Sequence, residues 1–329
     1  MQKILSFDFM KLFMALLIVA IHVYPFSSFS SELDFFFTHV FCRIGVPFFL
    51  MTTGYFVLSR AMKDRSVLKK YTIKILKLYG ICMLLYLPVN LYAHSFQGMG
   101  VLEILQAIFP NGTFYHLWYF PALLLGMWIV YSLVTRVKKW GLVFGIVSIL
   151  YLIGLFGDSY YGAILNVSLL QQFYDVIFNV FDYTRNGIFY VPIFLYLGYW
   201  IGNSSFKKSY KYYFIWFVVC LVFMLIEGGI LHFLGWQKHD SMYLNLIPVM
   251  YCFFAGVQKI STGNYKNLRA ISTVIYIVHP LVIIGVRVLA RITNLSFLVT
   301  QSIVNYLAVV FFSVLLSVLF EKCRQRFHF

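Results

Sequence analysis

Charged residues are scarce in this sequence: they make up 11% of the 329 positions, where soluble domains carry roughly 25%. Acidic residues are the rarer sign, with 11 Asp and Glu against 26 Lys and Arg. Apolar residues reach 61%, and the mean hydropathy is +0.83. This composition excludes an ordinary soluble domain. It predicts a polytopic membrane protein, because about 20 apolar residues cross a bilayer as one helix.

Cysteine and the common cofactor motifs are also sparse or missing. The five cysteines are scattered and show no C-x-x-C spacing, so neither a disulfide framework nor a zinc site is indicated. We find no Walker loop, dinucleotide glycine motif, H-E-x-x-H or G-x-S-x-G, and no internal repeat. The sequence therefore predicts no metal and no permanently bound cofactor.

Apolar runs separated by charged or Gly-, Asn- and Ser-rich breaks predict ten membrane-spanning helices. Their ranges are 7–27, 35–58, 78–94, 117–135, 141–157, 186–202, 212–232, 241–257, 268–289 and 300–320. Two amphipathic segments, 98–115 and 158–185, are predicted as re-entrant or interfacial structure on one side. We expect an all-α bundle that forms one membrane-embedded domain over 1–329, with a retained first span in place of a cleaved signal peptide.

The basic residues indicate which side of the bundle faces the cytoplasm, since Lys and Arg are enriched in cytoplasmic loops. Most fall on one side of the predicted topology: Lys3, Arg60, Lys63, Arg65, Lys69, Lys70, Lys74, Lys77, Arg136, Lys138, Lys139, Lys207, Lys208, Lys211, Lys259, Lys266, Arg269, Lys322, Arg324 and Arg326. Both termini are therefore predicted to be cytoplasmic, in a multi-pass protein of the cell membrane. The basic balance is a topology signal and does not support a nucleic-acid partner.

The first span carries three ionisable residues on one helical face. At 100° per residue, Lys11 and His22 differ by about 20°, and Asp8 and His22 by about 40°. Lys11 and His22 are about 16 Å apart along the axis, so they line one surface at two depths. Asp8 and Lys11 are spaced to pair. His22 is a candidate general base, with a buried, hydrogen-bonded histidine as the alternative, and Lys11 is either functional or reaches the inner surface.

Other ionisable residues also fall within predicted spans, where they are costly and usually functional. An unpaired Arg43 in the second span would be expensive, so we expect Glu227 or a ligand carboxylate as its partner. Tyr276 and His279 are three residues apart, just before Pro280, which bends the helix and frees a carbonyl. A helix-packing hydrogen bond explains this pair about as well as catalysis does.

Three further residues are candidates at the predicted outer side. His116 and Trp118 belong either to an aromatic belt at headgroup level or to the rim of a pocket. Arg185 forms either a loop ion pair with Asp182 or a site for an anionic acceptor.

The run His239-Asp240-Ser241 suggests a catalytic triad only superficially, because consecutive residues cannot converge on one line of proton transfer. We expect Asp240 or Ser241 to cap the helix of the eighth span.

Taken in order, these motifs resemble the integral-membrane acyltransferase 3 family. The family pattern of an Asp, a basic residue and a His is matched in the first span, and five later motifs follow in the family's order. The matching residues are Asp8, Lys11 and His22, then Arg43 to Phe49, Thr53 to Tyr55, the basic stretch 60–77, His116 to Tyr119, and Tyr276 to Pro280. The resemblance covers nearly the whole chain.

Within that family the chain is most similar to the membrane domain of the vancomycin-resistance serine racemases. The shared segments are His116 to Leu123, Gly157 to Ser159, Thr184 to Phe189 and Lys238 to Tyr243. Those proteins carry a pyridoxal-phosphate racemase domain after the membrane part. Because this chain stops at Phe329, we expect neither racemase activity nor that cofactor.

The family resemblance implies transfer of an acyl group, often acetyl, from acyl-CoA as co-substrate to a glycan or small-molecule acceptor. Lys11 and His22 match the family's motif pair, and Asp8 opens it. Lys11 stands where Arg is commoner, which removes a forked contact to phosphate or carboxylate. The resemblance places Arg43 and the His116 segment near the acceptor and the basic stretch 60–77 near the CoA phosphates.

The racemase-linked similarity supports a second function, a permease or binding domain for a small amino acid such as L-serine. In that case Arg43 and an acid such as Glu227 hold the zwitterion. A scaffold without any ligand is disfavoured by the buried charges.

Overall fold

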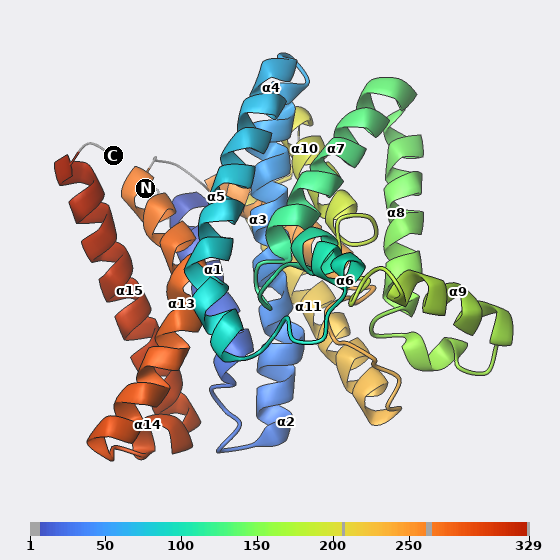
Figure 1. Cartoon of the computed structure of the whole chain (residues 1–329). Coiled ribbons are helices and arrows are strands. Elements are labelled where there is room, and N and C mark those ends of the chain that lie inside the picture. Colours follow the sequence, from blue (N-terminus) through green and yellow to red (C-terminus); the bar gives the residue numbers. More distant parts are fainter. Residues whose placement is uncertain (1–6, 206–207, 261–264, 328–329) are drawn as a thin grey trace. The chain divides into compact units, whose positions relative to one another are not determined.

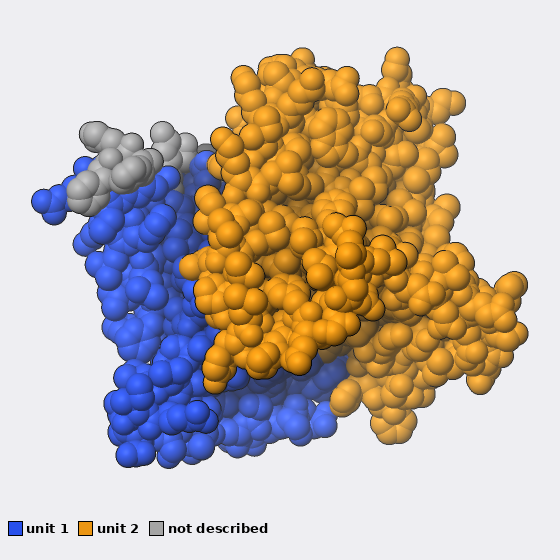
Figure 2. Space-filling view, viewed as in Figure 1, with its two compact units in different colours: residues 1–49, 208–228, 248–329 blue, residues 50–207, 229–247 orange. Residues whose placement is uncertain are grey.

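The computed structural model describes residues 7–205, 208–260 and 265–327, and within these ranges all regular elements are helices (Figure 1). This confirms the predicted all-α class. Lys3 and Lys207, assigned to the cytoplasmic side above, lie outside the described residues. The chain divides into two compact units, coloured in Figure 2. Unit 1 is residues 1–49, 208–228 and 248–329, and unit 2 is residues 50–207 and 229–247.

Six helical stretches in the described part of the chain are long and apolar enough to cross a membrane. They are Ser31–Ala61, α5 (Arg65–Tyr92), α7 (Tyr119–Val137), α11 (Tyr210–Phe233), α13 (Lys266–Thr293) and α15 (Ser302–Phe327). The other four predicted ranges hold shorter helices: α1 (Phe7–Val23), α8 (Trp140–Phe156), α10 (Val191–Asn203) and α12 (Leu246–Ile260). A helical membrane protein is thus supported, whereas ten spans and cytoplasmic termini stay predictions.

In unit 1, α1, α13 and α15 pack around an apolar core (Figure 1). The buried residues of this core are Ala15, Val19, Val23, Ile275, Val282, Ile283, Val286 and Val309. Gln325 near the end of α15 donates to Asn267 near the start of α13, and Asp8 near the start of α1 pairs with Arg269 of α13. The start of α1 and the end of α15 therefore lie at the same end of unit 1.

The second predicted span is helical but irregular. It runs through α2 (Ser31–Asp34), the π-helix η1 (Phe35–Val40), the 3₁₀-helix η2 (Phe41–Ile44), α3 (Gly45–Thr53), the π-helix η3 (Gly54–Leu58) and α4 (Ser59–Ala61). A regular helix over 35–58 was expected. π segments within α-helices are rare and concentrate at functional sites. Here they bracket Arg43, which lies in η2.

The third predicted span starts earlier than expected, because α5 begins at Arg65 and not at residue 78. Asp64 caps this helix: its side chain accepts a hydrogen bond from the Ser66 N–H at 2.8 Å. Lys is a good helix former. Lys69, Lys70, Lys74 and Lys77 therefore lie on the first turns of α5, and the prediction of a basic loop before the span was wrong.

Helix α10 crosses η3 at very short range within unit 2. A Cβ atom added to Gly54 would meet the backbone carbonyl of Leu195, and one added to Gly198 would meet the backbone carbonyl of Met51. The two backbones are therefore in direct contact, which only glycine permits.

The two amphipathic segments contain short helices of unit 2. These are α6 (Val101–Gln106), η4 (Ala107–Asn111), η5 (Tyr161–Ile164) and α9 (Ser168–Phe178). The Gln106 side chain donates to the carbonyl of Asn179 at 3.0 Å, and the Asp182 N–H donates to Asn111 Oδ1 at 3.2 Å. These bonds hold the two segments together. The prediction that both segments lie on one side of the membrane requires such contacts.

Candidate functional site

The charged face of α1 packs on α13. The Arg269 guanidinium contacts the Asp8 carboxylate at 2.9 and 3.2 Å, and the Tyr265 N–H donates to Asp8 Oδ2 at 3.0 Å. Lys11, one turn along α1, interacts electrostatically with both Asp8 and Arg269. Sequence reasoning paired Asp8 with Lys11 and missed Arg269, because the two segments are distant along the chain. Two cations around one carboxylate leave this end of unit 1 positively charged.

Fourteen residues after Asp8, the same face of α1 brings His22 against His279 of α13. The two imidazole rings stack, with centroids 5.3 Å apart and planes 22° from parallel. His279 is fully buried, and the ring of Tyr276 lies 6.2 Å from it. His22 thus faces a neighbouring helix, which brings together three residues predicted from two separate motifs.

Pro280 fixes the tautomer of His279. Proline has no N–H, so the Tyr276 carbonyl loses the backbone donor it would have in a regular helix. His279 Nδ1 lies 2.9 Å from that carbonyl and 3.1 Å from the carbonyl of Ile275. A carbonyl can only accept, so Nδ1 carries the proton and Nε2 carries a lone pair in the neutral ring.

Arg43 and Glu227 are both buried in unit 1. Arg43 Nε donates to the carbonyl of His39 at 3.4 Å, one turn back in the irregular second span. A direct pair between Arg43 and Glu227 stays a prediction, as does a ligand carboxylate at Arg43.

A second cluster forms around Arg185 in unit 2. The Arg185 guanidinium lies over the rings of Trp118 and Tyr183, 4.7 and 4.8 Å from their centroids. It also donates from Nη1 to Ser241 Oγ at 3.0 Å. The cation is therefore held by two aromatic rings and by one hydroxyl.

Asp158 organises the loop that carries Ser241. Its Oδ1 accepts hydrogen bonds from the N–H groups of Ser241 and Met242, at 2.7 and 2.9 Å, and from the Ser159 hydroxyl at 3.0 Å. The expectation that Ser241 or its neighbour caps the eighth span was wrong, since α12 begins only at Leu246. The backbone N–H groups of Ser241 and Met242 bond Asp158 instead, and the Ser241 hydroxyl accepts from Arg185.

All four segments that carry the racemase-linked resemblance contribute to this cluster. Each provides one residue: Trp118, Asp158, Arg185 and Ser241. Sequence reasoning selected Trp118 and Arg185 as binding residues and missed Asp158 and Ser241. The signal was present in the shared segments, but no spacing rule joins positions that are so far apart along the chain.

The pKa values of His239 and Asp158, which both lie near Arg185, are shifted from their ordinary values. Burial, together with the charges of Arg185 and Lys238, lowers the pKa of His239 to about 4. Burial raises the pKa of Asp158 to about 6, against the N–H bond from Ser241 and the charge of Arg185.

These two shifts predict opposite pH effects on stability. The pKa of Asp158 is raised in the folded protein, so its contribution to the free energy of unfolding is lost as the pH rises from 3.8 through about 6. The pKa of His239 is lowered in the folded protein, so its contribution to the free energy of unfolding is lost as the pH falls from 6.5 toward about 4. Relative to wild type, the melting temperature of Asp158→Asn should rise with pH between 4 and 6, and that of His239→Asn should fall.

Melting curves of the purified protein in detergent at several pH values measure both trends. Each group contributes at most about 1.4 kcal/mol per pH unit. His239 contributes less, because it is partly exposed and solvent screens its charge. Variants whose pH profiles run parallel to wild type would contradict the assignment.

His116 lies inside unit 2 and not in an exposed aromatic belt. Its buried ring contacts those of Tyr86, Tyr115 and Phe114, with centroids 4.8, 5.6 and 5.8 Å away. The belt interpretation is therefore wrong for His116, and its role at a pocket rim stays a prediction.

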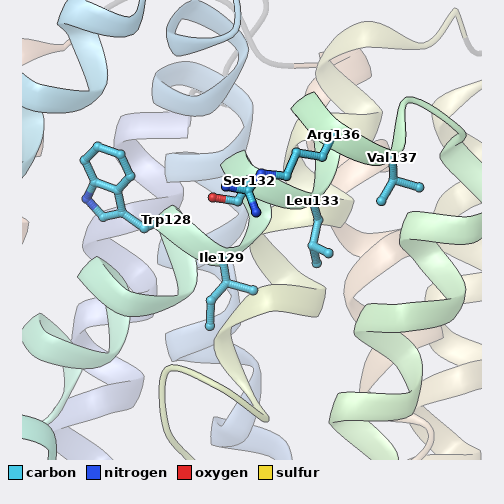
Figure 3. Close-up of a pocket in the computed structure, with 6 residues that line it drawn as sticks. All are labelled: Trp128, Ile129, Ser132, Leu133, Arg136 and Val137. Atoms are coloured by element: carbon cyan, nitrogen blue, oxygen red, sulfur yellow. The ribbon is translucent and has the colours of Figure 1, made fainter.

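An open depression of about 400 Å³ lies on α7 (Figure 3). Its lining comes from this helix alone: Trp128, Ile129, Ser132, Leu133, Arg136 and Val137. The Trp128 indole donates to Thr72 of α5 at 3.1 Å. The depression contains none of the site residues predicted from the sequence, although Arg136 belongs to the predicted cytoplasmic set.

Comparison with known proteins agrees with the motif pattern. Residues 4–322 match the family model described as an acyltransferase domain. An amino-acid racemase of Enterococcus faecalis is 42% identical over 94% of this chain and 44% of its own length. A serine/alanine racemase of Enterococcus gallinarum is 35% identical over 93% of this chain and 44% of its own length.

The chain thus spans less than half the length of these curated relatives, and no solved structure matches it. The family model, by contrast, covers nearly all of it, over the same residues that carry the histidine pair and the Arg185 cluster. The chain belongs to the acyltransferase 3 family of integral-membrane proteins.

Proposed function

We propose that this protein moves an acyl group, acetyl in the simplest case, from acyl-CoA to a hydroxyl or amine of a cell-envelope or small-molecule acceptor. The observation that carries the proposal is the stacked pair of His22 and His279. A histidine pair held between two helices, with His279 buried and His22 half-buried, supplies a proton acceptor at ordinary pH, which acyl transfer to a hydroxyl requires.

In this proposal His22 acts as the general base. It takes the proton of the acceptor hydroxyl or amine while that oxygen or nitrogen attacks the thioester carbon. The new C–O or C–N bond forms, the C–S bond breaks, and the imidazolium returns its proton to the leaving CoA thiolate. His279 positions His22 through the ring stack, and Pro280 keeps His279 in one tautomer.

The charged end of α1 is the proposed site for the phosphates of the donor. Lys11 and Arg269 lie around Asp8, and Lys11 is about 16 Å from His22 along the helix. The extended pantetheine arm of coenzyme A can cover that distance. Arg269 adds a second positive charge at this end of α1, although its Nε and Nη2 already bond the Asp8 carboxylate.

A second function is supported by different observations. The relatives are named for amino acids, one of them for serine and alanine, and Arg185 is a candidate partner for a carboxylate. We propose as the alternative that the chain binds or admits a small amino acid such as L-serine. No acyl transfer is involved in that case.

Both functions are measured on the purified chain reconstituted into lipid vesicles. Release of free CoA thiol from acetyl-CoA is followed with a panel of sugar, amine and amino-acid acceptors, and uptake of labelled L-serine is followed in parallel. Acceptor-dependent thiol release supports the acyltransferase. Vesicles that never consume acetyl-CoA with any acceptor, yet accumulate serine, would replace it with the alternative.

A further inference from the structure

The backbone around Arg185 is fixed on both sides. The Thr184 hydroxyl donates to the carbonyl of Gly154 at 2.7 Å, and both Thr184 and Asn186 are buried. Asn186 Oδ1 accepts from the N–H groups of Ile188 and Phe189, at 2.9 and 3.1 Å. Arg185 is therefore presented from a rigid turn, and little conformational entropy remains to be lost when it binds a ligand.

Two aromatic rings border the guanidinium of Arg185. Its central carbon lies 4.7 Å from the ring centroid of Trp118 and 4.8 Å from that of Tyr183. One of its N–H donors, on Nη1, is used by Ser241. Arg185 itself is partly exposed. An in-plane row of N–H donors matches the two oxygens of a carboxylate.

A hydrogen-bond acceptor lies beside this cation. The ring of His239 packs 4.4 Å from that of Tyr183, and one ring nitrogen bonds the backbone carbonyl of Asp182. Nε2 is buried and has no hydrogen-bond partner in the described part of the chain, so Nδ1 is the nitrogen that donates to that carbonyl. Nε2 therefore carries a lone pair that can accept a hydrogen bond.

We propose that Arg185 binds the carboxylate of a small amino acid, and that His239 Nε2 accepts a hydrogen bond from the ammonium or hydroxyl group of the same ligand. Ser241 braces the guanidinium, and Trp118 and Tyr183 form the walls of the site. The inference deepens the second proposed function and rests on it, but it does not depend on His22 or on acyl-CoA.

A purely structural role for Arg185 makes a different prediction. If the guanidinium only joins the loops of Trp118, Tyr183 and Ser241, its replacement lowers the melting temperature and does not select among ligands. If it binds a carboxylate, affinity depends on that group of the ligand as well.

The test is equilibrium binding to the full chain in nanodiscs, with L-serine and L-serinamide as probes. Serinamide keeps the ammonium and hydroxyl and lacks the carboxylate. Wild type should bind L-serine at least about tenfold more tightly than serinamide, because loss of one charge-assisted hydrogen bond weakens the affinity by about that factor. Arg185→Gln should remove that preference, and Arg185→Lys should restore part of it. His239→Ala should weaken both ligands equally.

Arg291→Gln is the matched control, since Arg291 is exposed and is not among the basic residues assigned to the cytoplasmic side. It should leave both affinities unchanged. Melting curves without ligand establish that each variant is folded. Equal affinity of wild type for serine and serinamide, no binding of either, or a folded Arg185→Gln that keeps the preference would overturn the inference. None of these binding results tests the acyltransferase proposal, which is decided by acyl transfer in vesicles.

Discussion

Replacing His22 with alanine should lower the kcat of acyl transfer by about 10² to 10⁴-fold, the usual contribution of a positioned general base. The ring is the proton acceptor in the proposed reaction, and the neighbouring His279 cannot take its place without moving, because Nδ1 is held by the carbonyls of Ile275 and Tyr276. The affinity for CoA should stay the same, since the proposed phosphate site lies about three helical turns away along α1.

Thiol release under saturating acetyl-CoA measures kcat, and binding of CoA is measured separately on the same samples. His232→Ala is the control, because His232 is exposed near the end of α11. His22→Ala protein that is folded, binds CoA and turns over at the wild-type rate would remove His22 from the mechanism. A parallel loss of CoA binding would instead make His22 part of the donor site.

Gly198→Ala should prevent α10 from packing against the end of α3 and the adjoining η3 as it does in the structure. The added methyl group would meet the backbone of Met51, which cannot rotate away as a side chain does. Overpacking of side chains costs about 1–3 kcal/mol, and we expect the upper end or more here. Gly54→Ala should have an effect of the same size, because its methyl group would meet the backbone of Leu195. The melting temperature and the yield of folded protein measure both.

A double variant makes this prediction sharper. Once one methyl group has forced the two helices apart, the second has room, so the combined loss of stability should be smaller than the sum of the single losses. Gly145→Ala is the control. A Cβ atom at Gly145 meets nothing within 4 Å, and alanine there should be neutral or slightly stabilising in α8. Single variants as stable as Gly145→Ala would show that the crossing is looser than described.

Local pattern was sufficient to predict the charged face of α1. Helical spacing placed Asp8 and His22 on one side, and both side chains do contact α13. The proline after His279 likewise predicted a carbonyl without its backbone hydrogen bond, and the His279 imidazole bonds that carbonyl. These predictions hold because each depends on the geometry of a single helix.

Features that depend on more than one segment were beyond the sequence. Arg269 looked like one more cytoplasmic cation until α13 brought it to Asp8. Ser241 looked like a helix cap, yet its N–H is taken by Asp158, far away along the chain. The π and 3₁₀ turns of residues 35–58 also left no trace in the hydropathy, since they change the backbone winding and not the apolar character.

The hydrogen bonds of His279 limit how protons can travel through the histidine pair. A ring that relays a proton must receive it on one nitrogen and release another from the opposite nitrogen. The Nδ1 proton of His279 points only at the carbonyl oxygens of Ile275 and Tyr276, which are too weakly basic to take it. His279 is therefore a dead end for proton conduction along α13. Any proton that reaches this pair has to depart by the route it came.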